Sequence, residues 1–204
     1  MTVRVLATAV LALALASTAA RAADPRYPDW PCTQAKVPEI SLAAVWAGPA
    51  LGDAETKWKD DAKVSALVSK LAARKTPLDE AEKSVKEFLS GSAADKSANA
   101  KLLFAGLFDT LNAQRSQVML GLERVSRKQR DAADKIREET LQLQALQGAT
   151  PRDEAKVEAL SNELIWKTRI FEDRHKVVRF VCEVPTSIDQ RLFALGRVIQ
   201  QEME

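Results

Sequence analysis

The sequence predicts an all-α protein: a helical bundle with a projecting antiparallel coiled-coil hairpin and a Pro-rich N-terminal arm. The composition is rich in Ala, Leu, Lys, Glu and Gln and poor in Gly and Tyr, which favours helices. Residues 95–147 contain no proline and repeat apolar side chains at seven-residue spacing. A short turn with Gly and Pro precedes a second stretch with the same spacing, so we expect two neighbouring antiparallel helices.

Residues 1–22 have the features of a secretory signal peptide. A positively charged start precedes the apolar run 5–16, and the Ala-Arg-Ala sequence that ends at Ala22 predicts cleavage before Ala23. The run is far shorter than the roughly 20 residues that span a bilayer. We therefore expect a soluble mature chain, periplasmic or secreted, with no transmembrane segment.

The mature chain is expected to carry balanced charge. Removing Arg4 and Arg21 leaves 28 basic and 28 acidic residues. Nucleic-acid binding needs net or clustered positive charge, so we do not expect a nucleic-acid partner. About 180 mature residues fit one domain. We divide the chain into the signal peptide, a Pro-rich arm at 23–51 and a helical bundle at 52–204 that includes the hairpin 95–183.

The chain has two cysteines, Cys32 and Cys182. An even number in an exported chain favours one disulfide, which would join the arm to a point near the C-terminal end. In the chain-entropy model, closing a loop of roughly 150 residues stabilises by about 5 kcal/mol. The alternative is two separate thiols, one of them reactive. Neither cysteine lies in a Cys-x-x-Cys motif or beside the single histidine.

The arm is expected to be mostly extended. It contains five of the eight prolines, and proline fixes φ and removes a backbone donor. Only residues 41–47 are predicted to form a short helix. Trp30 and Trp46 are expected to anchor the arm on the helical body. The alternative is that these two rings stack on a ligand.

Two motifs in the arm are Asp-Trp-Pro-Cys at 29–32 and Val-Trp-Ala-Gly-Pro at 45–49. Together they resemble a pattern of uncharacterised exported bacterial helical proteins. The resemblance supports export and implies no activity. The predicted hairpin also resembles that of periplasmic coiled-coil chaperones. This sequence, however, has neither the basic surface of that family nor a strand-rich stretch for its β core.

The hexapeptides TPLDEA at 76–81 and TPRDEA at 150–155 are nearly identical. In each, the threonine is a candidate N-cap, the proline suits the first helical position and the aspartate suits the first turn. The apolar positions that follow fall out of phase. We therefore predict two independent helix starts, at 77–90 and 151–183, and no duplicated module.

Other helices are predicted from their end signals. Asp53 is a candidate cap for a helix that runs to about residue 75. Gly91 suits the position after the end of the helix at 77–90. Pro185 is expected to break the returning helix, and Ser187 with Gln190 to form a capping box for a final helix at 188–204.

Seven-residue spacing defines the expected contact between the two long helices. The long helix has two interleaved sets: Phe104, Leu111, Val118, Val125, Ala132 and Phe108, Arg115, Leu122, Gln129, Ile136, Leu143. The returning helix has Val157, Leu164, Phe171 and Val178, with Ile165 close to them. Near the turn there are more leucines than one narrow contact can bury, so we predict that they touch a partner: Leu141, Leu143, Leu146 and Leu160.

The sequence predicts no catalytic, cofactor-binding or metal-binding residues, and so no enzyme. His175 is the single histidine, and Glu172 stands three positions before it. A di-metal helical bundle needs two such Glu-x-x-His motifs and further carboxylates. No glycine-rich phosphate loop or haem-attachment motif is present.

The favoured hypothesis is a non-catalytic exported protein that acts as an interaction or scaffold module through its hairpin, binding a protein partner or itself. The alternative is a small-molecule- or metal-binding module with a site in the bundle near Trp30, Trp46, Trp58 and His175. An enzyme whose site is built from Asp, Glu, Lys or Arg is the third hypothesis.

Overall fold

The computed structural model describes residues 24–204, apart from the side chain of Ala94. The predicted signal peptide and its cleavage point lie outside these residues. The described chain is an all-α bundle without strands, which confirms the predicted class. Its helices are α1 (Leu42–Val45), α2 (Ala54–Lys57), α3 (Ala62–Ala72), α4 (Leu78–Phe88), α5 (Ala93–Gly148), α6 (Glu154–Val181) and α7 (Glu183–Gln201).

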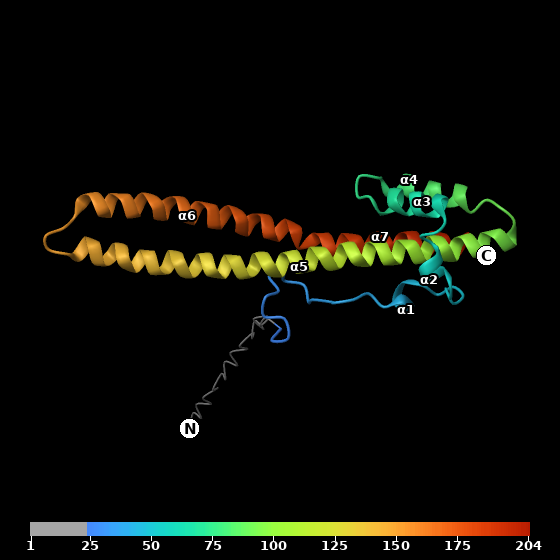
Figure 1. The fold of residues 1–204 in the computed structure, drawn as a ribbon, viewed down its shortest axis with the longest axis horizontal. Helices are drawn as coiled ribbons and strands as arrows, with labels where there is room; N and C mark the ends of the chain where they lie inside the picture. The colour runs from blue at the N-terminus through green and yellow to red at the C-terminus, as the bar shows by residue number, and fades with distance from the viewer. Residues whose placement is uncertain (1–23) are drawn as a thin grey trace, which may run out of the picture.

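Helix α5 organises the fold. Its 56 residues span roughly 84 Å at 1.5 Å per residue. Helix α6 runs back along its second half and α7 continues along its first half, where α1 to α4 also lie (Figure 1). Phe104 and Leu107 of α5 are fully buried there with Leu192, Leu195 and Ile199 of α7. Over residues 24–204, no helix has both the length and the apolar character needed to cross a membrane.

The helix predicted from Asp53 to residue 75 is wrong, because two helices occupy this stretch. Helix α2 ends at Lys57, and Asp61 caps α3 by accepting from the amides of Lys63 at 2.8 Å and Val64 at 3.0 Å. The break between them lets the Trp58 ring pack onto α5. A Cβ built on Gly106 of α5 would lie 2.9 Å from that ring, so the glycine permits the close approach.

The two similar hexapeptides start their helices differently. The Thr76 hydroxyl donates to the Lys70 carbonyl at 2.9 Å, and α4 begins after Pro77 with no side-chain cap. In the second hexapeptide Asp153 is the cap, accepting from the Lys156 amide at 3.1 Å. The predicted threonine caps are therefore wrong. Thr76 instead donates to a carbonyl in the last turn of the preceding helix, which also accepts from the Ala73 amide at 3.3 Å.

The returning helix ends ahead of Pro185, as predicted, but the final helix begins at Glu183 and not at residue 188. Only Cys182 separates α6 from α7, so Pro185 is the third residue of α7. Amides in the first turn of a helix have no intrahelical acceptor, and proline is tolerated there. The capping box of Ser187 and Gln190 does not form, because these residues lie inside α7. Gly91, which follows α4, does not have the left-handed backbone that was expected there. Gly52, in the loop before α2, does have a left-handed backbone, with φ of 56°.

Candidate interaction surface

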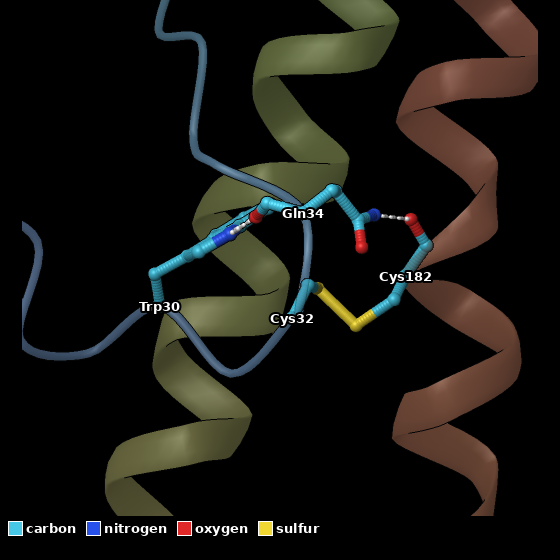
Figure 2. Close-up of a disulfide and its surroundings, with 4 residues drawn as sticks. All are labelled: Trp30, Cys32, Gln34 and Cys182. Carbon is cyan, nitrogen blue, oxygen red and sulfur yellow. Dashed lines mark hydrogen bonds between the residues drawn. A yellow bond between two sulfur atoms is a disulfide. The ribbon is translucent and has the colours of Figure 1, made fainter. Parts of the chain in front are cut away.

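The predicted disulfide between Cys32 and Cys182 is confirmed, and the alternative of two separate thiols is wrong. Their Cα atoms lie 5.6 Å apart across 150 residues of sequence. Figure 2 shows how the neighbouring arm residues support it. The Trp30 indole donates to the Gln34 carbonyl at 2.7 Å, and the Gln34 side-chain amide donates to the Cys182 carbonyl. The arm is thus fastened where α6 meets α7.

Ion pairs hold the arm against one side of α5. Lys36 Nζ lies 2.5 Å from Glu123 Oε1, and each side chain is only 14% exposed. Asp29 binds Arg130 and also Arg127, the latter at 2.7 Å. Hydrogen bonds from Arg130 and then Arg127 hold the pKa of Asp29 below its ordinary value. The three partners on α5 are spaced by three and four residues, so the arm covers one face of that helix.

The tryptophans of the arm region pack on the protein itself. Trp46 stacks on Phe104 with ring centroids 4.3 Å apart and donates to the Pro49 carbonyl at 2.8 Å. Trp46 and Trp58 belong to the main core, whereas Trp30 belongs to a second cluster beside the disulfide. His175 is exposed on α6. These four residues, expected from the sequence to lie near one ligand site, do not converge on one cavity.

The inner face of α6 meets α5. Val157, Leu164 and Val178 of the predicted seam are buried, and the Gln129 amide donates to the Phe171 carbonyl at 3.2 Å. Further from the disulfide, Lys167 Nζ lies 2.5 Å from Glu139 Oε1. Hydrogen bonds to Glu139 and then to Glu163 raise the pKa of Lys167.

The outer face of α6 carries exposed large apolar side chains. Trp166 is 62% exposed and Phe180 is 77% exposed. We define the outer α6 surface as Trp166, Ile170, Val177 and Phe180, of which all but the half-buried Ile170 are exposed. Ile165 lines a hollow with the seam residues Leu143 and Leu164, so it lies close to the inner seam as expected, although it is 66% exposed.

We did not predict this surface, although the sequence contains a signal for it. Residues 166, 170, 173, 177 and 180 alternate at spacings of four and three, as the inner seam does. Four of these positions are apolar and the fifth is Asp173. Helix α6 therefore has two apolar seams on different sides, and only the inner one contacts α5.

The four leucines predicted to touch a partner are covered to different degrees. Leu141 is 61% exposed. Leu143, Leu146 and Leu160 are half-buried. They lie on the parts of α5 and α6 that adjoin the connecting turn, where Figure 1 shows these two helices alone.

The buried Arg115 and the half-buried Arg191 both have structural partners. Arg115 donates to Asp189 at 2.7 Å and to the Pro38 carbonyl at 3.2 Å, which joins α5, α7 and the arm. Burial raises the pKa of Asp189 although Arg115 opposes the change. Arg191 donates to the carbonyls of Leu71 at 2.6 Å and Thr76 at 2.9 Å, and burial lowers its pKa. Both guanidinium groups therefore have hydrogen-bond partners within the protein, and neither needs a ligand.

A cavity of about 700 Å³ lies beside the arm, between the arm, α2 and α5. Its polar lining includes Glu39, Glu55 and Asp109, and Lys59 pairs with Asp109 at 3.0 Å. His175 and the three tryptophans named above do not line it. Within residues 24–204 no three His, Cys, Asp or Glu side chains are grouped in a way that could hold a metal ion.

Comparison with protein-family models, with curated proteins and with solved structures found no match to this chain. The resemblance of the arm to exported bacterial helical proteins therefore stays a prediction. The function has to be argued from the surface of the molecule itself.

Proposed function

We propose that this chain is a non-catalytic exported protein whose α5–α6 pair binds a protein partner or a second copy of itself. The observation that carries the proposal is the outer α6 surface, where Trp166 and Phe180 are 62% and 77% exposed. Large apolar side chains gathered on one face of a helix mark interaction sites. Tryptophan is also among the residues that contribute most to binding when they become buried in an interface.

The spacing of this surface favours a helical partner. Trp166, Ile170, Val177 and Phe180 follow the alternation of four and three that buries side chains between two helices. Asp173 falls within the same stripe, and a polar residue at such a position fixes the register of a helical pair. The partner would lay one helix along α6, on the side away from α5.

The disulfide supports the exported location. Disulfides persist in oxidising compartments such as the periplasm and the cell exterior. The bond between Cys32 and Cys182 also fastens the arm to the C-terminal end of α6, so that end of the helix is held in place. A helical pair held in this way presents its outer face with little loss of conformational entropy on binding.

The test uses the mature protein starting at Ala23. Sedimentation over a range of concentrations and cross-linking with mass spectrometry would be compared between the wild type and the double variant Trp166→Glu/Phe180→Glu. We expect the wild type to form a dimer or a cross-linked complex through α6, and the double variant to lose it while keeping its helical circular dichroism. The matched control is Leu78→Glu on α4, where the replaced leucine is 40% exposed.

The leucines near the turn are tested separately with Leu141→Glu. If this variant alone loses the complex, the contact lies near the turn and not on the outer α6 surface. A wild type that stays monomeric and forms no cross-linked complex through either region would contradict the proposal.

A further inference from the structure

The arm covers one side of α5, and a separate apolar groove lies between α5 and α6. The arm binds α5 through Glu123, Arg127 and Arg130. The groove, of about 590 Å³, is lined from α5 by Gly121, Val125 and other residues, none of which pairs with the arm. Ligand sites commonly have volumes of about 300–1,000 Å³, so this groove has the size of one.

The groove exists because α5 has a glycine at its floor. A Cβ built on Gly121 would meet nothing within 4 Å, so this position opens into free space. Around it the walls are aliphatic: Val118, Leu122, Val125, Val177, Val178 and Val181. Two of these valines face solvent, since Val125 is 39% and Val177 is 59% exposed. Such a wall fits an unbranched hydrocarbon chain, which needs apolar contact and no hydrogen-bond partner.

Two cations stand at one end of the groove. Lys128 and Arg174 line it, and no carboxylate does. The hydrogen bond from Gln129 to the Phe171 carbonyl aligns the helices so that both cations lie at the end away from the disulfide. Neither Lys128 nor Arg174 joins an ion pair within the described residues, whereas Lys167 and Lys176 of α6 do. This end therefore has unneutralised positive charge beside an apolar trough.

We propose that this groove binds a single-chain anionic amphiphile of the fatty-carboxylate class. The hydrocarbon tail lies over Gly121 between the valines, and the carboxylate pairs with Lys128 and Arg174. Arginine and lysine bind a carboxylate through charge-assisted hydrogen bonds, while the tail is removed from water. The site is separate from the protein contact proposed above. Of the residues that line the groove, only Val177 belongs to the outer α6 surface.

The test measures binding of dodecanoate, below its micelle concentration, by native mass spectrometry and titration calorimetry on the full mature protein. We expect one dodecanoate per chain and no binding of dodecyltrimethylammonium, which has the same tail and the opposite charge. Gly121→Leu should abolish dodecanoate binding by filling the trough. This variant should fold, because the Cβ direction is open and leucine is a better helix former than glycine.

The charge requirement is tested with Lys128→Gln and Arg174→Gln, each of which should weaken dodecanoate binding about fivefold. The matched control is Arg124→Gln, an exposed cation of α5 that does not line the groove, and it should bind as the wild type does. Absence of saturable dodecanoate binding would overturn the proposal. Equal binding of the cationic amphiphile, or dodecanoate binding that survives Gly121→Leu, would overturn it as well.

Discussion

Arg115 of α5 and Asp189 of α7 form an ion pair in which the two charges are buried unequally. Their Nε and Oδ1 atoms lie 2.7 Å apart, with the arginine side chain 3% exposed and the aspartate 39% exposed. Arg115 occupies a position of the predicted apolar seam, where a charge without a partner would be strongly destabilising. Asp189 supplies that partner from a helix that lies 74 residues further along the chain.

The unequal burial predicts unequal effects of removing each partner. Asp189→Asn should lower the free energy of unfolding by about 2 kcal/mol, because it leaves a buried cation unpaired. Arg115→Met should cost about 1 kcal/mol or less, because the partly exposed carboxylate can hydrate and methionine fills the space. Urea unfolding of both variants at pH 7 measures the difference. Equal losses would contradict this account of the pair.

The same pair predicts a pH effect. Burial raises the pKa of Asp189 above its ordinary 3.8, although Arg115 lowers it in part. A raised pKa means that the folded state binds this proton more tightly, so the carboxyl's contribution to stability falls as pH rises from 3.8 through the folded pKa. In Arg115→Met the pKa should rise further, which NMR titration of the Asp189 carboxyl measures.

Loss of the disulfide should destabilise the whole fold. It closes a loop of 150 residues, and removing such a bond typically costs about 2–5 kcal/mol. Denaturant unfolding of the oxidised protein, the reduced protein and the variant Cys32→Ala/Cys182→Ala gives the size of the effect. The reduced protein and the variant should agree, and both should unfold at lower denaturant. An unchanged midpoint would contradict the prediction.

Two glycines of α5 should respond in opposite directions to the same substitution. Gly106→Ala should lower stability by about 1–3 kcal/mol, because its Cβ would lie 2.6 Å from Val68 Cγ2 and 2.9 Å from the Trp58 ring. Gly121→Ala should raise stability by about 0.5–1 kcal/mol, because its Cβ enters open space and alanine favours the helix. Thermal unfolding of the two variants, compared with the wild type, tests both signs.

The arm should loosen in acid. Hydrogen bonds from Arg130 and Arg127 hold the pKa of Asp29 below its ordinary 3.8. A lowered pKa means that the contribution to stability is present above 3.8 and is lost as pH falls through the folded pKa. Amide exchange in the arm should therefore rise in that range, and Asp29→Asn should raise it at neutral pH. The control is Asp24→Asn, whose ion pair with Arg26 lies within the arm and does not reach α5.

The sequence predicted those features of the fold that depend on local spacing. The seven-residue repeat placed Leu122, Leu164 and Val178 on faces that the structure buries between α5 and α6. The even cysteine count predicted the disulfide. The supercoil of a true coiled coil stays a prediction, as do the partner contacts of the turn leucines. Spin labels at Gln129 and Thr168 would measure how closely the two helices approach in solution.

Features that depend on distant neighbours could not be predicted in this way. The Thr76 hydroxyl can cap its own helix or bond to the end of the preceding one, and the position of α3 decides between them. Pro185 is tolerated because α7 begins at Glu183, which the local pattern does not indicate. The outer α6 surface was missed because two apolar seams overlap on one helix, and the sequence does not say which seam α5 covers.

The ion pair between Lys167 and Glu139 should hold the distal parts of α5 and α6 together. Their Nζ and Oε1 atoms lie 2.5 Å apart, and Lys167 also binds Glu163 of its own helix at 2.6 Å. Hydrogen bonds to both carboxylates raise the pKa of Lys167 above its ordinary 10.5. This contribution is therefore present below pH 10.5 and is lost as pH rises through the folded pKa.

Removing this charge should affect the contact between the helices more than the helix itself. In Lys167→Gln, hydrogen exchange should become faster in both α5 and α6 near the turn, because the link between them is lost. The control is Lys176→Gln, whose pair with Asp173 at 3.2 Å lies within α6 and spans three residues. That variant should change exchange only locally in α6, since pairs within one helix stabilise it weakly. Similar exchange in the two variants would mean that the interhelical ion pair does not hold α5 and α6 together.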